Sequence, residues 1–403
     1  MKIENAFRSI QWGYGEGAVK IPLYLVVIPA EKVAEKAEIF RRTPQRKSGY
    51  QRGLRATRLG RNKSGVVGYI LDQMGVFPTS ILVNIRKEDG ALQFEKKGQL
   101  GDNIDVGDLV LPDDLTWYVV DGQHRLEGLK VAMREQKGLK TYPVIVTMTN
   151  EDMFYEMLIF YIVNSRAKSV ETGLVYRILQ RMLYDVKAPK WISQTIMTGS
   201  DRRKAIAAMI VDLLNQKPTS PFYGRVKEIG EIKTDYLTED QTLTRYVALV
   251  LSERTFSEMY DEDVADLLID YWIAIKNVYS ACFRDPANYF LLKTIGLSSF
   301  MRLFPTIYAY SVREGQGSEK TMEKYIRYLL EKTPDHTDVD FRGPIDEAWW
   351  HKTDGPGIVH GTGEGHYQEV AQRIAEKIKL VLKKERQEQN NPDEHIIKEA
   401  SRE

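Results

Sequence analysis

The segment TWYVVDGQHRLEGLKVAMRE (116–135) decides the fold, because a β-branched run gives way at Asp121 and Gly122 to a helical pattern. After Gly122, apolar side chains recur three or four residues apart, which predicts an amphipathic helix over 123–135. A second β-branched run, YPVIVTM (142–148), predicts another strand. Strand, turn, helix and strand in this order are typical of the βαβ pattern around a mixed or parallel sheet.

The patterns on either side of this segment predict an α+β chain. Strands are expected at 20–29 and 80–86, and helices at 31–42 and 64–75. After residue 150 strand signals are rare, and helices are predicted at 151–163, 172–186, 203–215, 238–251, 262–281, 289–311, 318–333 and 367–386. We therefore predict three domains: a sheet domain over 1–150, an α-helical domain over 151–315, and C-terminal helices with a Gly/His-rich loop and a polar tail over 316–403.

Composition excludes several classes of protein. The chain has 403 residues, a formal net charge of +1 and one cysteine, Cys282. A single cysteine excludes an intrachain disulfide framework and a multi-cysteine metal site, and its helical surroundings predict a buried residue. We find neither the apolar stretch of a signal peptide nor a run of about 18 apolar residues, so we expect a cytoplasmic protein without a membrane partner.

The turn Asp121-Gly122-Gln123-His124-Arg125 carries the clearest chemistry. A helix N-terminus has unpaired N–H groups and a partial positive charge, so it attracts anions. Gly122 allows a tight turn and close approach of a ligand, while His124 and Arg125 add donors suited to phosphate. Asp121 could accept from a ligand hydroxyl, cap the helix or hold a metal-bound water. The alternative is structural: Asp121 only caps the helix, and Arg125 only pairs with Glu127 or a neighbour.

A basic stretch precedes the turn. Residues 39–71 contain no Asp or Glu and nine positive charges, so they could bind polyphosphate or the backbone of a nucleic acid. Tyr50 could stack on a base, but aromatic residues are sparse, which favours backbone contact. The alternative is a solvated basic surface. The candidate DNA-binding residues are Arg41, Arg42, Arg46, Lys47, Arg55 and Arg58.

Other familiar sites are absent or weak. The sequence contains no P-loop, no G-x-S-x-G and no H-E-x-x-H. His351, His360 and His366 cluster after Trp349, but their spacing fits no zinc pattern, so we expect no metal site there. Asn164 follows an apolar helical run, where the simplest hypothesis is a cap.

The motif at 121–125 matches the signature of the DGQHR-domain family, which is similar to the ParB/sulfiredoxin-like superfamily. YQR (50–52), VFPTSILVNI (76–85) and FYIVNSRAKSV (160–170) resemble further conserved parts of that family. The resemblance covers roughly residues 20–180 and implies a ParB/sulfiredoxin-like mixed-sheet domain. Sulfiredoxins carry a reactive cysteine where this chain has Gln123, so sulfinic-acid reduction is excluded because no thiolate is present.

The resemblance also implies a role in bacterial DNA modification. In the DpdB group of the family, the protein is thought to be an ATPase that assists a base-exchanging, transglycosylase-type partner in inserting 7-deazaguanine into DNA. In the DndB group, linked to DNA phosphorothioation, it is associated with regulation and DNA binding. LEGL (126–129) is more similar to the first group, with DndB as the nearest alternative.

Carried over to this chain, the resemblance assigns residues to a site for ATP, with Mg²⁺ as an accompanying ion. The candidate catalytic residues are Asp121, His124 and Arg125. The candidate nucleotide- and phosphate-binding residues are Gly122, Gln123, His124, Arg125, Gln51, Arg52 and Asn164.

Three hypotheses for function follow. The first is an ATP-hydrolysing component of a DNA base-modification system. The second is a non-enzymatic DNA-binding regulator, and the third is a scaffold gated by nucleotide binding. The compact anion site and the near-zero net charge favour the first. DNA and a modification enzyme are the expected partners, and a homo-oligomer is left open.

Overall fold

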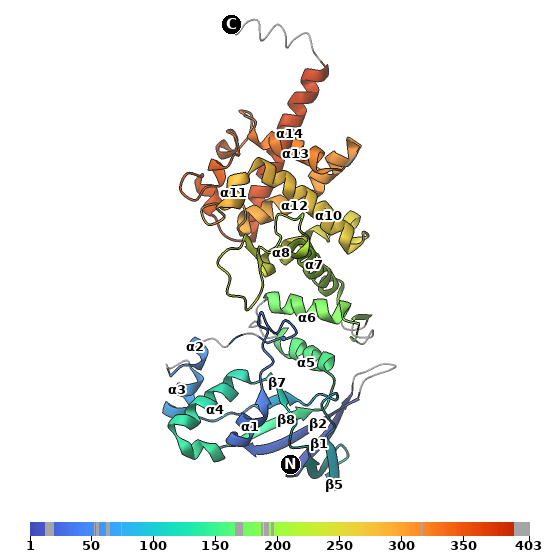
Figure 1. The fold of residues 1–403 in the computed structure, drawn as a ribbon, viewed down its shortest axis with the longest axis vertical. Coiled ribbons are helices and arrows are strands. Elements are labelled where there is room, and N and C mark those ends of the chain that lie inside the picture. Colours follow the sequence, from blue (N-terminus) through green and yellow to red (C-terminus); the bar gives the residue numbers. More distant parts are fainter. Residues whose placement is uncertain are drawn as a thin grey trace. The chain divides into compact units, whose positions relative to one another are not determined.

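The structure is a computed structural model that describes residues 1–12, 20–51, 53, 56–61, 65–73, 75–165, 172–186, 188, 193–194, 197–315 and 317–390 (Figure 1). It divides into two compact units. Unit 1 comprises Met1–Ile178 and Lys187–Pro189, and unit 2 comprises Leu179–Val186 and Lys190–Glu403. The domain boundaries predicted at 150 and 315 stay predictions.

Unit 1 is built on one mixed sheet. Its strands are β1 (Lys2–Trp12), β2 (Lys20–Pro29), β3 (Ala37–Glu38), β4 (Ile81–Asn84), β5 (Gln93–Leu100), β6 (Ile104–Val110), β7 (Trp117–Asp121) and β8 (Pro143–Thr149). They lie in the order β3-β7-β4-β8-β2-β1-β6-β5. Its helices are α1 (Ala30–Lys36), α2 (Ala56–Leu59), α3 (Val66–Asp72), α4 (Gln123–Glu135), η1 (Lys137–Thr141) and α5 (Met153–Ser165).

The α+β class and the mixed sheet are confirmed, but the parallel alternative is wrong. Strand β7 pairs antiparallel with β4, and β4 pairs parallel with β8. The two strands that flank α4 therefore run in opposite directions with β4 between them. Local patterns located β7, α4 and β8, whereas the strand directions depend on β4, which comes earlier in the chain.

The core of unit 1 lies between the sheet and the helices α1, α3 and α4. Strand β2 alternates in burial: Tyr24, Val26 and Ile28 are buried, whereas Leu25 and Val27 are exposed. The buried set joins one cluster with the apolar stripe of α4. Since a fully buried apolar side chain contributes about 1.5–3 kcal/mol, this packing holds the start of α4 against the sheet.

Several elements of unit 1 were missed or misplaced by sequence patterns. Strands β1, β5 and β6 were not predicted. Strand β5 reads QFEKKGQL, lies at the sheet edge and is largely exposed, so its polar sequence carries no alternating signal. The helix predicted over 31–42 is too long, because α1 ends at Lys36 and the chain continues into β3.

Unit 2 is helical. Its elements, with α6 containing the division between the units, are α6 (Thr172–Tyr184), α7 (Gly199–Gln216), β9 (Val226–Lys227), β10 (Thr238–Glu239), α8 (Asp240–Val250), α9 (Arg254–Ser257), α10 (Asp261–Val278), α11 (Ser280–Arg284), α12 (Thr294–Arg313), α13 (Glu319–Arg327), η3 (Tyr328–Leu330), η4 (Val339–Phe341), η5 (Ala348–Trp350), η6 (Gly357–His360) and α14 (Glu364–Asn390). The predicted helices of this region are confirmed, with shifted ends.

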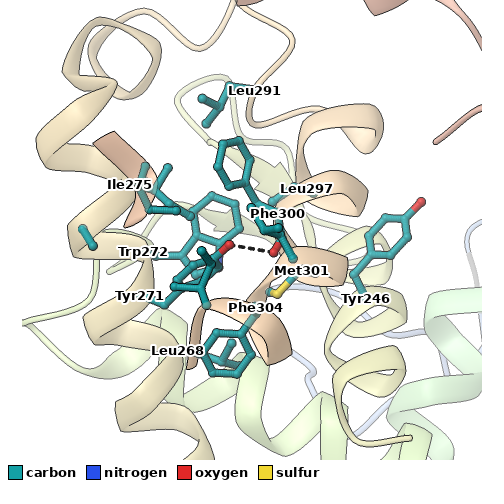
Figure 2. Packing of buried hydrophobic residues seen from close by; sticks show 14 of the residues in the cluster. Tyr246, Leu268, Tyr271, Trp272, Ile275, Leu291, Leu297, Phe300, Met301 and Phe304 are labelled. Atoms are coloured by element: carbon teal, nitrogen blue, oxygen red, sulfur yellow. Dashed lines mark hydrogen bonds between the residues drawn. The ribbon is translucent and has the colours of Figure 1, made fainter. Parts of the chain in front are cut away.

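The core of unit 2 is aromatic. Figure 2 shows Trp272, Phe300 and Phe304 packed together, and the Tyr271 hydroxyl donates to the Phe300 carbonyl oxygen at 2.8 Å. Cys282 is buried as expected, and burial raises the pKa of its thiol to about 12. Within the described residues, no helix combines the length and the apolar character that spanning a membrane requires.

Candidate functional site

The turn between β7 and α4 depends on Gly122. Its φ of +95° lies in the left-handed region that side chains with a Cβ disfavour. A Cβ at this position would lie 3.1 Å from Nη2 of Arg125 and 3.2 Å from Cγ1 of Ile81. The backbone conformation and the space around it both call for glycine.

Arg125 holds the turn together. Its Nη2 donates to Oδ2 of Asp121 at 2.8 Å, and its Nη1 donates to the backbone carbonyl oxygen of Thr79 at 2.7 Å and to the Thr79 hydroxyl. The structural alternative for Arg125 is thus partly realised, with Asp121 as the acid. Asp121 does not cap α4, because Gly122 occupies the N-cap position without a side-chain hydrogen bond. Thr79, which no local pattern pointed to, ties the turn to the segment before β4.

The first turn of α4 carries a positive field. It contains no acidic residue, and the first helical hydrogen bond runs from the Leu126 N–H to the Gly122 carbonyl oxygen at 2.9 Å. By helix geometry, the N–H groups of Gln123, His124 and Arg125 precede that bond and have no carbonyl acceptor within the helix. Such an end attracts anions.

Two glutamines near this turn have buried amide oxygens without a donor among the described residues: Oε1 of Gln51 and Oε1 of Gln123. Gln51 is 1% exposed, and its Nε2 donates to the carbonyl oxygen of Val119 in β7. A buried polar atom left without a partner costs about 1–3 kcal/mol, so these oxygens suit a molecule that brings donors. An amide oxygen repels phosphate, and ribose hydroxyls or an amino group fit it better.

In the folded chain, acids from elsewhere pair with some of the arginines of the basic stretch. Arg46 pairs with Glu38 at 2.5 Å, and Arg41 lies 3.8 Å from Glu127 of α4. Arg42 is 9% exposed, and its Nη1 donates to the backbone carbonyl oxygen of Lys47. Acids from outside the stretch thus neutralise part of it, and the Arg41–Glu127 pair brings it to α4.

Of the remaining predicted residues in this part of the chain, Arg58 is exposed on α2. Arg52 and Arg55 lie outside the described residues. The assignment of all these side chains to DNA or nucleotide stays a prediction.

A buried polar cluster beside Gln51 was not predicted from the sequence. Glu156 of α5 is fully buried and accepts from the Tyr50 hydroxyl at 2.6 Å, from Nη2 of Arg86 at 2.8 Å and from Nδ2 of Asn84 at 2.9 Å. Burial, reinforced by the Glu156 carboxylate, raises the pKa of the Tyr50 hydroxyl well above its usual range, so it stays a donor.

This Glu156 cluster (Tyr50, Asn84, Arg86 and Glu156) fixes the residue next to Gln51 and joins it to β4 and α5. The Arg86 guanidinium also lies 3.5 Å from the centre of the Tyr118 ring at the start of β7. The cluster therefore positions the segment that carries Gln51 against the strand that leads to the turn. A lone acid in the apolar run MFYEMLIF was the one sequence signal for it.

Asn164 lies in the last turn of α5, where its Nδ2 donates to the Phe160 carbonyl oxygen at 2.8 Å. This bond lies within its own helix, whereas the cap predicted from the sequence would follow the helix. Its assignment to a nucleotide stays a prediction.

The three histidines of the predicted Gly/His-rich loop have protein partners, and His360 and His366 lie in η6 and α14. His351 lies 2.9 Å from Asp354, His360 packs edge-on against Phe290, and Nε2 of His366 lies 2.7 Å from the carbonyl oxygen of Ile358. Among the described residues, no group of three or more His, Cys, Asp or Glu side chains is arranged to hold a metal ion.

Comparison with protein families gives one match. The family model described as DndB, DNA-sulfur modification-associated, matches residues 18–280. That range contains the turn, the basic stretch and the Glu156 cluster. No curated protein and no solved structure matches the chain.

Proposed function

The chain belongs to the DndB family of proteins associated with DNA-sulfur modification, and from this premise we propose that it binds and hydrolyses ATP in that role. Membership associates the protein with a DNA-modification system. It confirms DndB, the nearest alternative within the resemblance, whereas the similarity to the DpdB group stays a prediction. The match supports sulfur as the modification served. Insertion of 7-deazaguanine, which the similarity to the DpdB group implied, is the competing proposal. DNA and a modification enzyme are the partners that this role requires.

The observation that carries the proposal is the chemistry around the start of α4. The N-terminal end of a helix whose first turn contains no acid suits phosphates, and the oxygens of Gln51 and Gln123, which have no donor among the described residues, suit hydroxyl or amino groups. A nucleotide combines both kinds of group in one molecule. A bare phosphate or a DNA backbone would leave the two amide oxygens unsatisfied.

In this proposal the residues of the turn have different roles in binding and hydrolysis. Gly122 lets the phosphates approach the backbone, and His124 and Arg125 offset charge that develops on them during hydrolysis. Arg125 is prepositioned by Thr79 and Asp121, so little ordering is needed when the ligand binds. The side chain of Asp121 is 45% exposed, and the carboxylate oxygen that does not accept from Arg125 could orient water or a Mg²⁺-bound water.

The test is phosphate release from ATP by the purified chain, with and without duplex DNA. We expect His124→Ala/Arg125→Ala to abolish release, because phosphates would lose two donors. Gln123→Met, which removes the donorless oxygen and leaves the backbone N–H, should weaken nucleotide binding. Arg134→Ala removes an exposed arginine from the last turn of the same helix and serves as the matched control.

Equal activity in the wild type and the double variant would place hydrolysis elsewhere, most simply in a contaminant. Absence of release from the wild type under every condition, including with a modification enzyme present, would refute the enzymatic role. Nucleotide binding measured by calorimetry would then decide between a nucleotide-gated scaffold and a protein that binds no nucleotide.

A non-enzymatic DNA-binding regulator is the second candidate. The family description and the exposed arginine Arg58 on α2 support it. Under this hypothesis, duplex DNA binds with strong salt dependence and no turnover, and substitutions of Arg41 and Arg58 weaken it.

A further inference from the structure

Helices α12 and α14 of unit 2 pack against each other (Figure 1). A cationic hollow lies between them. It has a volume of about 310 Å³ and is lined by Tyr310, Lys379, Leu382, Lys383, Arg386 and Gln387. Three of these six residues are cations, and none is an acid. The hollow lies beyond residue 280, where the family match ends.

The three cations form a row. Lys379, Lys383 and Arg386 are four and three residues apart on α14, so they share one face and span about 10 Å along the helix axis. All three side chains are exposed. Within the described residues, none of them forms an ion pair or a side-chain hydrogen bond, in contrast to Arg373 on the same helix, which lies 3.6 Å from Glu376.

Two carboxylates of this region, Glu314 and Glu385, are bound by other side chains. Glu314 at the end of α12 binds Lys324 and the Tyr325 hydroxyl, both at 2.7 Å. Glu385, next to Arg386 in sequence, accepts from the Tyr328 hydroxyl. Both acids are held by side chains that do not line the hollow, so the row keeps its positive charge.

We propose that the hollow between α12 and α14 binds the phosphodiester backbone of DNA, as a contact separate from the turn at the start of α4. A row of solvent-exposed cations matches the repeated charges of a strand, since phosphates on one strand recur every 3.4 Å along the duplex axis. A site for a small phosphate compound would enclose its ligand, whereas these cations lie in the open. Tyr310, whose ring lies 5.3 Å from that of Tyr325 between centroids, forms the α12 side of the hollow.

The experiment measures binding of a fluorescent 24-base-pair duplex by anisotropy, in the full chain, at a series of salt concentrations. The test variant is Lys379→Gln/Lys383→Gln/Arg386→Gln. The matched control is Lys276→Gln/Arg284→Gln/Lys320→Gln, which removes the same charge from exposed positions of unit 2 that do not line the hollow. Because all six side chains are exposed, both variants should keep the wild-type thermal unfolding temperature.

We expect the test variant to lose at least tenfold in affinity at low salt. Each phosphate contact contributes about 0.9 to the slope of log K against log salt, so three lost contacts should lower the slope by about 2.7. Single substitutions should each lower it by about 0.9. The control should bind within twofold of the wild type.

Two results would overturn the proposal. Equal losses in the test and control variants would show that only the overall charge of unit 2 matters. Displacement of the duplex by equimolar inorganic triphosphate, but not by a second duplex of different sequence, would assign the hollow to a small polyphosphate. Phosphate release from ATP is expected to be unchanged in the test variant, so failure here is distinguishable from failure of the proposed enzymatic function.

Discussion

Each unit buries a charged side chain, but the two are compensated differently. In unit 1, the Glu156 carboxylate meets the Arg86 guanidinium and two neutral donors. In unit 2, Lys377 of α14 is fully buried, and it forms no ion pair with a carboxylate of the described residues. Its ammonium donates instead to the carbonyl oxygens of Glu331 at 2.6 Å, Gly343 at 2.8 Å and Phe341 at 3.1 Å, and to the Thr333 hydroxyl at 3.0 Å.

The difference shows two ways to fasten an irregular segment. A buried ion pair gains from mutual attraction but loses the hydration of two charges, so it is valuable mainly for the geometry it enforces. The carbonyl groups around the Lys377 ammonium also fix the geometry, but as neutral dipoles they stabilise its positive charge less than a carboxylate would. Burial accordingly lowers the pKa of Lys377 to about 8, whereas Glu156 has a full counter-charge at hydrogen-bond distance.

Removing the acid of the pair should have the largest effect. Glu156→Ala leaves the Arg86 cation buried without its counter-charge and the Tyr50 hydroxyl without its acceptor. Breaking a buried pair in this way costs about 3–5 kcal/mol of the free energy of unfolding, which urea unfolding measures. Hydrogen exchange of the backbone amides of Tyr50 and Gln51 measures the local opening of the segment. Glu151→Ala, which removes an acid that pairs with the exposed Lys87, is the control. A loss below about 1 kcal/mol for Glu156→Ala would mean that the cluster does not position Gln51.

Replacing the buried lysine should cost less. Lys377→Met leaves three carbonyl oxygens without their donor, which corresponds to about 1–3 kcal/mol at pH 7. Lys379→Met, two residues along the same helix but exposed, is the matched control. Indistinguishable urea midpoints for Lys377→Met and the control would refute the fastening role of Lys377.

The pH dependence sharpens the contrast. The pKa of Lys377 is about 8 in the folded chain and about 10.4 in the unfolded chain, so between these values the unfolded chain binds more protons. The free energy of unfolding of the wild type, relative to Lys377→Met, should therefore rise with pH through this window. The slope cannot exceed about 1.4 kcal/mol per pH unit. A flat difference between pH 8 and pH 10 would contradict this assignment.

Local patterns in the sequence predicted the elements whose geometry depends on neighbouring residues. The helix α4, the strand before it and the turn between them followed from periodicity and from Gly122, because their geometry is set by adjacent residues. The partners of the turn could not be predicted in this way. Arg125 binds Thr79, 46 residues earlier, and Tyr50 binds Glu156, 106 residues later. Such pairs depend on the order and direction of strands, for which a single sequence offers no signal.

The same reason explains the overestimate of the basic stretch. Its composition contains no acid, yet the fold supplies Glu38 and Glu127 to two of its arginines. A charge count along the sequence records proximity in the chain, whereas neutralisation depends on proximity in space. The row on α14 escaped notice in the sequence for the opposite reason, since Glu385 lies beside it in the chain but is held by Tyr328.

The smallest expected effect on stability concerns the turn itself. Gly122→Ala puts a Cβ on a residue with φ of +95°, which costs about 1–2 kcal/mol. The added methyl would also lie 3.1 Å from Nη2 of Arg125 and would displace the guanidinium from Asp121. The matched control is Gly138→Ala in η1, where a Cβ would meet nothing within 4 Å. Unfolding in urea should show the loss for Gly122→Ala alone.

Nucleotide binding by Gly122→Ala then tests whether the turn binds phosphate or has only a structural role. If phosphates bind the N–H groups at the start of α4, a methyl group at Gly122 blocks their approach, and the loss of affinity should exceed the loss of stability when both are expressed as free energies. If the turn is purely structural, Gly122→Ala should still lower the free energy of unfolding by about 1–2 kcal/mol, but the affinity of the folded chain for ATP should not change. Because the folded fraction is measured in the same samples, the two outcomes separate even though the substitution is destabilising.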